Sequence, residues 1–427
     1  MMGDRIKRLL VETPQGPSGY LNKESRYSFN YATTKREREV SLVMPLRAES
    51  YASGALFSVF EMNRPEGYLL DALRKRFAKI KVLDDMDLLA ITGTNQIGRL
   101  SYIAEGQPQR VRKAEVTKDE LIASRASVEL FDFLVDTCFD SGISGFQPKV
   151  IAPVQVTEKT TSRTSDFIVK SAGEDYPHLA QNEFLCMSVA REAGIETPPF
   201  WLSDDGGLFI MSRFDIVDER RLGVEDMAVL MKRSPEQKYN GSYEMIARAL
   251  DVFCPQTAAT QKQKLFEYVA LSCLVRNGDA HLKNFSLIYE APASGARLSP
   301  LYDVVTTTVY EIVHPRTGAT HTDRTLALNL RKSKTFPTFD ELANFGSGVC
   351  GVRDSIGVID RIEDAKRSVL DAQRDRIHPW LLSSIEREWC VSVPGLHVGT
   401  RKSSQLVTEP RPTGTSREIT TDPDDQT

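Results

Sequence analysis

Alternating apolar and polar positions predict a small sheet near the start of the chain. In RYSFNYA, Tyr27, Phe29 and Tyr31 alternate with polar residues, as a strand with one buried face requires. The stretch IKRLLVET is read as another strand, and PQGPSG between the two as a turn or loop. Farther along, EGYLLDALRKRFAKI spaces its apolar residues at helical intervals. These elements predict a small α/β subdomain over residues 1–110.

The next hundred residues, 111–216, are read as a strand-rich lobe. A helix predicted over 118–139 is followed by the strand-like stretches KVIAPVQV, DFIVK and GLFIMSRFD, and TEKTTSRTS is read as a polar loop. A second helix is predicted over 180–194 and ends at Gly194, a residue type that suits the position just after a helix. This pattern predicts a sheet with few helices.

After residue 217 the apolar spacing becomes mostly helical. Helices are predicted over 225–232, 242–251, 258–276, 338–345, 359–375 and 379–390. A loop–strand–loop stretch over 277–305 interrupts them. Residues 401–427 hold almost no apolar side chains, which predicts a disordered tail. The whole pattern predicts an α+β protein. The N-terminal subdomain is followed by two lobes, a strand-rich one over residues 111–216 and a mainly helical one over residues 217–400.

Composition narrows the class of protein only slightly. Lys and Arg number 54 and Asp and Glu 58, so the formal net charge of −4 argues against nucleic-acid binding through bulk charge. The six cysteines form no CxxC, which favours reduced thiols over a metal site. The first twenty residues lack the apolar stretch of a signal peptide, and no run approaches the ~18 apolar residues of a membrane span. We therefore expect a cytoplasmic protein with no membrane contact.

The stretch RNGDAHLKNFSLIYE carries the most informative spacing. Asp279 and Asn284 lie five residues apart, in a loop predicted between a helix and a strand. Phosphoryl transfer needs a carboxylate aimed at the attacking hydroxyl and a hard oxygen ligand for Mg²⁺, and protein kinases place these two groups at this spacing. Asp303, the next isolated carboxylate, is expected to be the second Mg²⁺ ligand. Because an isolated DxxxxN is more often structural, the spacing needs support from elsewhere.

Features upstream supply that support. Lys170 ends a predicted strand, where kinases keep the lysine that contacts the phosphates of ATP, and Glu183 on the following helix could pair with it. The stretch SGISGFQPK before that strand has two glycines for close approach to phosphate. Within it, Ser144 is either a turn residue or a candidate for autophosphorylation. His281 is expected to be a structural support, and no other histidine clusters with it to form a zinc site.

These motifs resemble those of the HipA toxins, serine/threonine kinases of type II toxin–antitoxin systems, over about residues 40–390. SGISGFQPK resembles the phosphate loop SGxQPK, FIVK the strand with the ATP lysine, and SRFD the hinge usually written ERFD. EDMAVLMKRSPEQKY, NGDAHLKNFS and LSPLYDVV are similar to EDxxQxxxxxxxxKY, NxDxHxKNFS and LxPxYDxx. RPEGYLLDAL resembles the LPEG segment of the family's N-terminal subdomain. The shared order of so many motifs makes the resemblance specific.

The resemblance implies a two-lobed protein-kinase-like fold and a role for each matching residue. Asp279 would be the catalytic base, Asn284 and Asp303 would bind Mg²⁺, and Glu183 would pair with the ATP lysine. The implied ATP-binding residues are Ser144, Gly145, Gln147, Lys149, Lys170, Arg213, Phe214, His281 and Lys283. Two positions depart from the family pattern. Gly142 stands where many members have a serine, which leaves Ser144, ahead of Ser141, as the autophosphorylation candidate, and Ser212 replaces the usual hinge glutamate.

For function, the resemblance implies a Mg-ATP-dependent kinase that phosphorylates an aminoacyl-tRNA synthetase, typically the glutamyl enzyme, and so arrests growth. Its partner would be a small helix-turn-helix antitoxin of the HipB type, with DNA contacted only through that antitoxin. Two alternatives are a small-molecule phosphotransferase, because aminoglycoside and phosphoinositide kinases share the DxxxxN spacing, and a non-catalytic binding protein on the same fold. The SGxQPK-like loop and the N-terminal subdomain disfavour the first, and the intact set of predicted catalytic residues disfavours the second.

Overall fold

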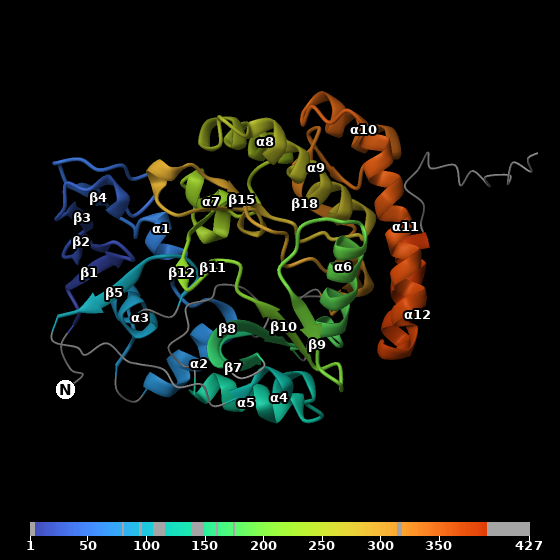
Figure 1. Ribbon diagram of the computed structural model, residues 1–427, viewed down its shortest axis with the longest axis horizontal. Coiled ribbons are helices and arrows are strands. Elements are labelled where there is room, and N and C mark those ends of the chain that lie inside the picture. Colours follow the sequence, from blue (N-terminus) through green and yellow to red (C-terminus); the bar gives the residue numbers. More distant parts are fainter. Residues whose placement is uncertain are drawn as a thin grey trace, which may run out of the picture. The chain divides into compact units, whose positions relative to one another are not determined.

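The computed structural model describes residues 5–78, 81–93, 96–105, 116–137, 149–158, 161–173, 176–313 and 318–390. Strands dominate the first half of the described chain and helices the second (Figure 1), so the predicted α+β class is confirmed. Within the described ranges, no helix combines the length and the apolar character that a membrane crossing requires. The predicted tail at 401–427 and the boundary predicted at residue 110 lie outside the described residues, and the residue ranges of the two lobes stay predictions.

An antiparallel five-stranded sheet of order β4-β3-β2-β1-β5 forms the N-terminal subdomain, here residues 5–105. Its elements are β1 (Arg8–Thr13), β2 (Gly16–Lys23), β3 (Tyr27–Tyr31), β4 (Tyr51–Ser53), α1 (Ser58–Glu61), α2 (Gly67–Phe77), α3 (Asp85–Thr92) and β5 (Ser101–Ala104). Strand residues such as Leu9 and Phe29 share one core with Phe60 of α1 and Met86 of α3. The strands predicted in IKRLLVET and RYSFNYA and the helix predicted from Glu66 are confirmed.

The turn or loop predicted for PQGPSG is confirmed at residues 14–15 and wrong beyond them, because strand β2 begins at Gly16. Pro17 lies opposite Glu12, beside an irregularity in the β1–β2 register, where the missing N–H of proline is tolerated. A Cβ on Gly19 would lie 2.1 Å from the carbonyl oxygen of Asn30. Proline and glycine therefore serve a bulge and a close strand contact here, which sequence patterns do not separate from a loop.

The second sheet has the order β6-β7-β8-β10-β9. Its strands are β6 (Val116–Thr117), β7 (Lys149–Glu158), β8 (Thr161–Ser171), β9 (Phe200–Leu202) and β10 (Leu208–Ser212), and its helices are α4 (Lys118–Ile122), α5 (Ser127–Thr137) and α6 (Leu179–Glu192). Val169 packs in a cluster with Leu121 of α4 and Leu134 of α5. Because side chains alternate along a strand, Ile168 and Lys170 face the opposite side, toward the cavity described below.

Two predictions for this lobe were wrong. TEKTTSRTS is not a loop, because β7 and β8 pair from Lys149–Lys170 as far as Glu158–Thr161, and backbone hydrogen bonds do not require apolar side chains. The helix predicted over 118–139 is broken into α4 and α5. The break lies where the backbone N–H and hydroxyl of Ser127 donate to the Asp205 carboxylate at 3.0 and 2.6 Å, a contact made from a distant turn.

The rest of the described chain is mainly helical, as predicted. The helices are α7 (Met227–Leu230), α8 (Tyr243–Phe253), α9 (Ala258–Leu274), α10 (Phe339–Gly348), α11 (Ser355–Gln373) and α12 (Pro379–Cys390). The strands are β11 (Ile216–Val217), β12 (Arg220–Arg221), β13 (Gly223–Asp226), β14 (Ser286–Tyr289), β15 (Arg297–Leu298), β16 (Ile312–Val313), β17 (Thr320–His321), β18 (Thr325–Leu330) and β19 (Ser333–Thr335). The predicted helix 225–232 is shorter because its first residues form β13.

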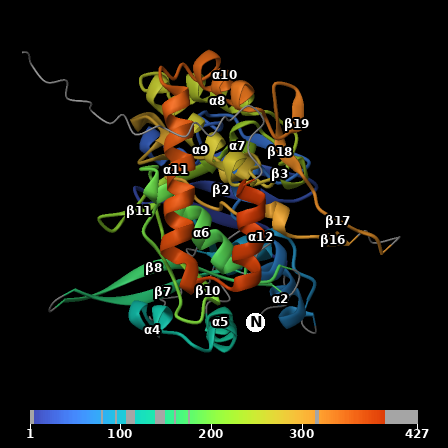
Figure 2. The same ribbon diagram turned by 90° about the vertical axis from the view of Figure 1, so that its right-hand side faces the viewer.

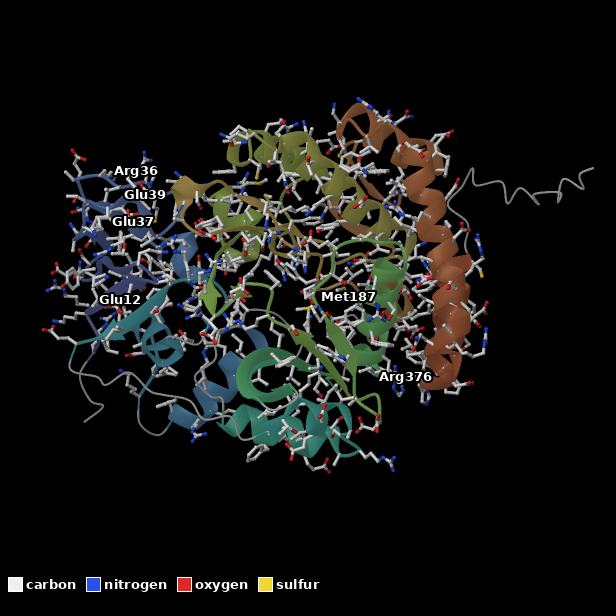
Figure 3. All side chains as sticks on the ribbon, viewed as in Figure 1. Glu12, Arg36, Glu37, Glu39, Met187 and Arg376 are labelled. Atoms are coloured by element: carbon white, nitrogen blue, oxygen red, sulfur yellow. The ribbon has the colours of Figure 1, made fainter. Side chains whose placement is uncertain are left out.

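Helix α6 joins the second sheet to the helical region. It contacts β8, β9 and β10 on one side and α11 on the other, and Figure 2 shows α11 running alongside it. Met187 in the middle of α6 is fully buried, and Figure 3 labels it together with Arg376, which follows α11. The Arg376 guanidinium lies 5.0 Å from the Phe184 ring centroid and donates to the carbonyl of Leu202 at 3.4 Å. These contacts fix α6, which carries Glu183, against the sheet.

Candidate active site

A cavity of about 500 Å³ is lined by residues from three regions of the chain. From the N-terminal subdomain come Met62, Asn63, Glu66 and Ile97, and from the second sheet come Ile168, Lys170 and Met211. The predicted site residues that line it are Lys170, Phe214, Asp279, His281, Lys283, Asn284 and Asp303. Four of them lie in the stretch that connects α9 to β14, residues 275–285, called the Asp279 loop below. The fold therefore brings together residues that are more than a hundred positions apart.

Lys170 is held between two carboxylates at the back of the cavity. Its Nζ donates to Glu183 Oε1 at 2.5 Å and to Asp303 Oδ1 at 2.8 Å. Lys170 and Glu183 are almost completely buried. Burial alone lowers the pKa of Lys170, but the charges of Asp303 and Glu183 outweigh it, so the pKa lies above its ordinary value. The amine therefore stays protonated and offers a fixed positive charge to the cavity.

Asp303 and Asn284, the two predicted Mg²⁺ ligands, are in direct contact. The Asn284 amide Nδ2 donates to Asp303 Oδ2 at 2.9 Å, and Asn284 Oδ1 accepts the backbone N–H of His281 at 3.0 Å. Asp303 has a φ of 62°, a left-handed conformation that is uncommon for aspartate and that recurs at functional sites. The described residues contain no group of three or more His, Cys, Asp or Glu suited to a metal ion. One carboxylate and one amide instead suit Mg²⁺ that also takes oxygens from phosphate and water.

Asp279 is oriented by a residue that the sequence analysis did not single out. The Tyr239 hydroxyl donates to Asp279 Oδ1 at 2.8 Å, and the Asp279 backbone N–H donates to Asn277 Oδ1 at 3.0 Å. Burial and the neighbouring Asp279 carboxylate raise the pKa of Tyr239, so its hydroxyl remains a donor. The signal was present in the sequence, since Tyr239 ends the EDMAVLMKRSPEQKY segment.

His281 lies deep in the same wall. Its Nε2 is 3.9 Å from Asp279 Oδ2, and its ring packs edge-on against Tyr239 with centroids 5.3 Å apart. Burial, with the positive charge of Lys238, lowers the pKa of His281 to about 3, so the ring is neutral at working pH. The ring is buried but also lines the cavity, so the structural role and the contact with ATP that were expected for His281 both stay predictions.

An apolar compartment occupies another part of the cavity. The rings of Phe214 and Tyr302 stack with centroids 5.1 Å apart and planes 16° apart. Tyr302 accepts the Ser286 hydroxyl at 2.6 Å and donates to the carbonyl of Lys283 at 3.0 Å. Flat apolar rings beside aliphatic residues such as Ile97 suit a planar, aromatic ligand. The LxPxYDxx-like segment contained the signal for Tyr302, which was not used.

Arg213 has a different placement from the one expected for an ATP-binding residue. It is not among the residues that line the cavity. Its guanidinium donates two hydrogen bonds to the Asp215 carboxylate, at 2.9 and 2.6 Å, and one to the carbonyl of Gln96 at 2.7 Å. Asp215 in turn accepts the backbone N–H of Gly98 at 2.7 Å. This buried pair holds the turn that presents Ile97 to the cavity, which favours a structural role for Arg213.

The predicted phosphate loop cannot be placed with the others. Ser144, Gly145 and Gln147 lie outside the described residues, as does the side chain of Lys149, whose backbone opens β7. Their expected contacts with ATP stay predictions. Of the six cysteines, Cys138 also lies outside the described residues, and the other five are free thiols, four of them buried.

Comparison with known proteins adds the family context. The HipA N-terminal domain model matches residues 9–103, and the HipA-like C-terminal domain model matches residues 141–372, more than half of the chain. A relative from Sinorhizobium fredii named "Putative kinase Y4dM" is 31% identical over 198 residues, which cover 42% of this chain and 45% of the relative. A "Putative kinase" of Haemophilus influenzae is 28% identical over 186 residues, covering 39% of this chain and 53% of the relative. The chain thus spans about half the length of these relatives.

A solved structure shares the fold. The HipA chain in a complex titled as the Shewanella oneidensis HipA, HipB and operator DNA complex has a TM-score of 0.65 and 20% sequence identity to this chain. The similarity covers 89% of this chain and 97% of that one. It confirms the predicted α+β, two-lobed, kinase-like architecture with its additional N-terminal subdomain.

Proposed function

The chain belongs to the HipA family, and from that premise we propose that it is an ATP-dependent kinase that transfers a phosphoryl group to a serine or threonine hydroxyl of a protein. One observation supports the proposal most directly. The series Lys170–Asp303–Asn284, joined by contacts of 2.8 and 2.9 Å, shares one cavity with Asp279. These are the positive charge, the metal-binding oxygens and the carboxylate that phosphoryl transfer requires.

In the proposed reaction each side chain has one task. Asp279, held by Tyr239, accepts the proton of the attacking hydroxyl. Lys170, fixed by Glu183, offers its positive charge to the phosphates. Asn284 and Asp303 would hold Mg²⁺, which supplies further positive charge beside the phosphates. The compartment around Phe214 and Tyr302 would receive the adenine ring.

We propose that the acceptor is an aminoacyl-tRNA synthetase and that the glutamyl enzyme is the first candidate. Its phosphorylation would arrest growth. A helix-turn-helix antitoxin of the HipB type would neutralise the kinase, and DNA would be bound through that antitoxin. Support comes from family membership and from the two-domain match, because small-molecule kinases are not expected to carry the HipA N-terminal domain. The cytoplasmic location expected from the sequence fits this acceptor.

Acceptor assays test the proposal. Purified protein is incubated with Mg²⁺ and labelled ATP, either with a panel of aminoacyl-tRNA synthetases or with aminoglycosides and inositol derivatives. We expect label on a synthetase and none on the small alcohols. Transfer to a small alcohol alone would support the alternative phosphotransferase, and no transfer to any acceptor or to the protein itself would contradict the kinase proposal.

Autophosphorylation at Ser144 gives a separate prediction. Incubation with Mg-ATP is expected to add one phosphoryl group, seen by intact mass, and Ser144→Ala is expected to abolish the addition while transfer to the acceptor persists. A phosphate there adds about −1.5 to −2 charges within a segment predicted to hold ATP phosphates, so Ser144→Asp should weaken ATP binding on the order of tenfold. Addition of phosphate to the Ser144→Ala variant would place the modified residue elsewhere, with Ser141 the next to test.

Tyr239→Phe tests the orientation of Asp279. A hydrogen bond of this kind contributes about 0.5–1.5 kcal/mol, so we expect kcat to fall roughly three- to tenfold with little change in the KM for ATP. Tyr243→Phe is the matched control, since that hydroxyl donates to the carbonyl of Ala280 in the same loop at 3.1 Å rather than to the Asp279 carboxylate. Equal losses of kcat in the two variants would contradict a specific role of Tyr239 in orienting Asp279.

A further inference from the structure

We infer that Glu66 of the N-terminal subdomain is a positioning residue for Lys283 of the Asp279 loop, so that this subdomain completes the active site. The inference rests on the proposed function for its kinetic consequences and on the contacts of Glu66 for its structural basis. Lys283 Nζ lies 2.9 Å from both carboxylate oxygens of Glu66, although the two residues are 217 positions apart. Both residues line the cavity.

The ion pair lies in a partly dry environment. The side chains of Lys283 and Glu66 are 11% and 22% exposed, so solvent screens their attraction less than at an open surface. Lys283 lies between Asp279 and Asn284 in sequence, and all three residues line the same cavity. A lysine has a long flexible stem, so its position depends on what its ammonium contacts.

The Glu66 side chain does not cap helix α2, the helix that it precedes. Glu66 is the residue before α2, with extended backbone angles, and its side chain makes no capping hydrogen bond to the helix. Residues at this position usually direct their side chains to the first N–H groups of the helix. The Glu66 carboxylate turns to Lys283 instead, and the positive end of the α2 dipole favours its negative charge.

The turn that carries Glu66 is fixed within its subdomain. Asn63, three residues earlier, donates to the Tyr102 hydroxyl at 2.8 Å and to the carbonyl of Val59 at 3.3 Å, all in buried positions. Arg64, between Asn63 and Glu66, donates to the Asp85 carboxylate. The carboxylate that reaches Lys283 therefore has a rigid base.

The subdomain is fixed in turn to the rest of the site. Glu225 on β13 is fully buried and accepts the Ser41 hydroxyl at 2.6 Å and the Leu42 backbone N–H at 2.7 Å. The Arg213–Asp215 pair holds the Gln96–Gly98 turn from the same side, as described above. With both anchors in place, Glu66 keeps a defined position relative to the Asp279 loop.

A second carboxylate explains why the orientation of Lys283 needs this control. Asp226 is buried, lines the same cavity and interacts with the charges of both Lys283 and Glu66. Without the Glu66 charge, Asp226 would be the remaining carboxylate among these groups to attract the lysine. Glu66 thus keeps the ammonium on the cavity that Asn284 and Asp303, the proposed Mg²⁺ ligands, also line.

The experiment compares Glu66→Gln, Lys283→Gln and the double variant. Calorimetry with Mg²⁺ measures affinity for ATP and for ADP, and steady-state assays measure kcat. We expect each single variant to lose kcat on the order of tenfold and to lose ATP affinity several-fold more than ADP affinity, because the lysine acts on the terminal phosphate. The double variant should match Lys283→Gln alone, because both substitutions remove one shared interaction.

Glu61→Gln is the matched control. Glu61 lies five residues earlier, pairs with Arg64 at 3.4 Å and does not line the cavity, so this variant should keep the wild-type ratio of ATP to ADP affinity. A wild-type ratio in Glu66→Gln, tighter ATP binding by that variant, or additive losses in the double variant would overturn the inference. If the wild type transferred no phosphate, the proposed function would fail, and the affinity ratio would still decide the role of Glu66.

Discussion

Asp279→Asn is expected to lower phosphoryl transfer on the order of 10²- to 10⁴-fold, the usual contribution of a general base. The asparagine keeps the size of the side chain and can still accept the Tyr239 hydroxyl, so the fold and ATP affinity should change little. Single-turnover assays with labelled ATP measure the rate, and calorimetry and thermal unfolding check binding and folding. The loss should therefore appear in kcat rather than in the KM for ATP.

Asp323→Asn is the matched control for Asp279→Asn. Asp323 also lines the cavity, but its carboxylate accepts the backbone N–H and the hydroxyl of Thr325 at 3.0 and 2.7 Å. We expect near-wild-type transfer from this variant. Near-wild-type transfer by Asp279→Asn would remove Asp279 from the role of base, whereas equal losses in both variants would indicate a general charge effect in the cavity.

Local sequence patterns predicted most elements but not those set by distant contacts. The strands around Lys170 and the helix with Glu183 follow from spacing alone. The break between α4 and α5 does not, because it depends on Asp205, which lies 78 residues from Ser127. Strand β2 was missed because its proline and glycine serve a bulge and a close contact, and these look like loop residues in a sequence.

The same distinction applies to the site. Asp279 and Asn284 could be proposed from the sequence because they lie five residues apart in one short loop, and Lys170 and Asp303 because the order of motifs is specific. Tyr239 and Glu66 were not assigned, since their partners lie 40 and 217 positions away and the pairing exists only after folding. The placement of Arg213 could not be predicted for the same reason, because its neighbour Phe214 lines the cavity while its own side chain turns to Asp215 and Gln96, and its contact with ATP stays a prediction.

Asp303→Asn should separate metal binding from nucleotide binding. In the present structure the Asp303 carboxylate contacts Lys170 and Asn284, so it is both a proposed Mg²⁺ ligand and a negative charge beside the phosphate site. Its neutralisation should weaken Mg-ATP binding at least on the order of tenfold, because a hard carboxylate ligand is lost. ATP without metal should bind equally well or more tightly, because Lys170 loses a competing partner and the phosphates lose a like charge.

Glu183→Gln is the matched control for Asp303→Asn, because both residues contact Lys170. Glu183 also contacts Lys170, at 2.5 Å, but it does not line the cavity, so its loss should affect ATP to the same extent with and without Mg²⁺. Calorimetry of both variants under the two conditions gives four affinities. A metal-dependent loss confined to Asp303→Asn supports metal ligation, and equal losses with and without Mg²⁺ in Asp303→Asn would mean that the carboxylate acts only by placing Lys170. Because the two substitutions remove the two partners of one buried lysine, the difference between them isolates what Asp303 does for the metal.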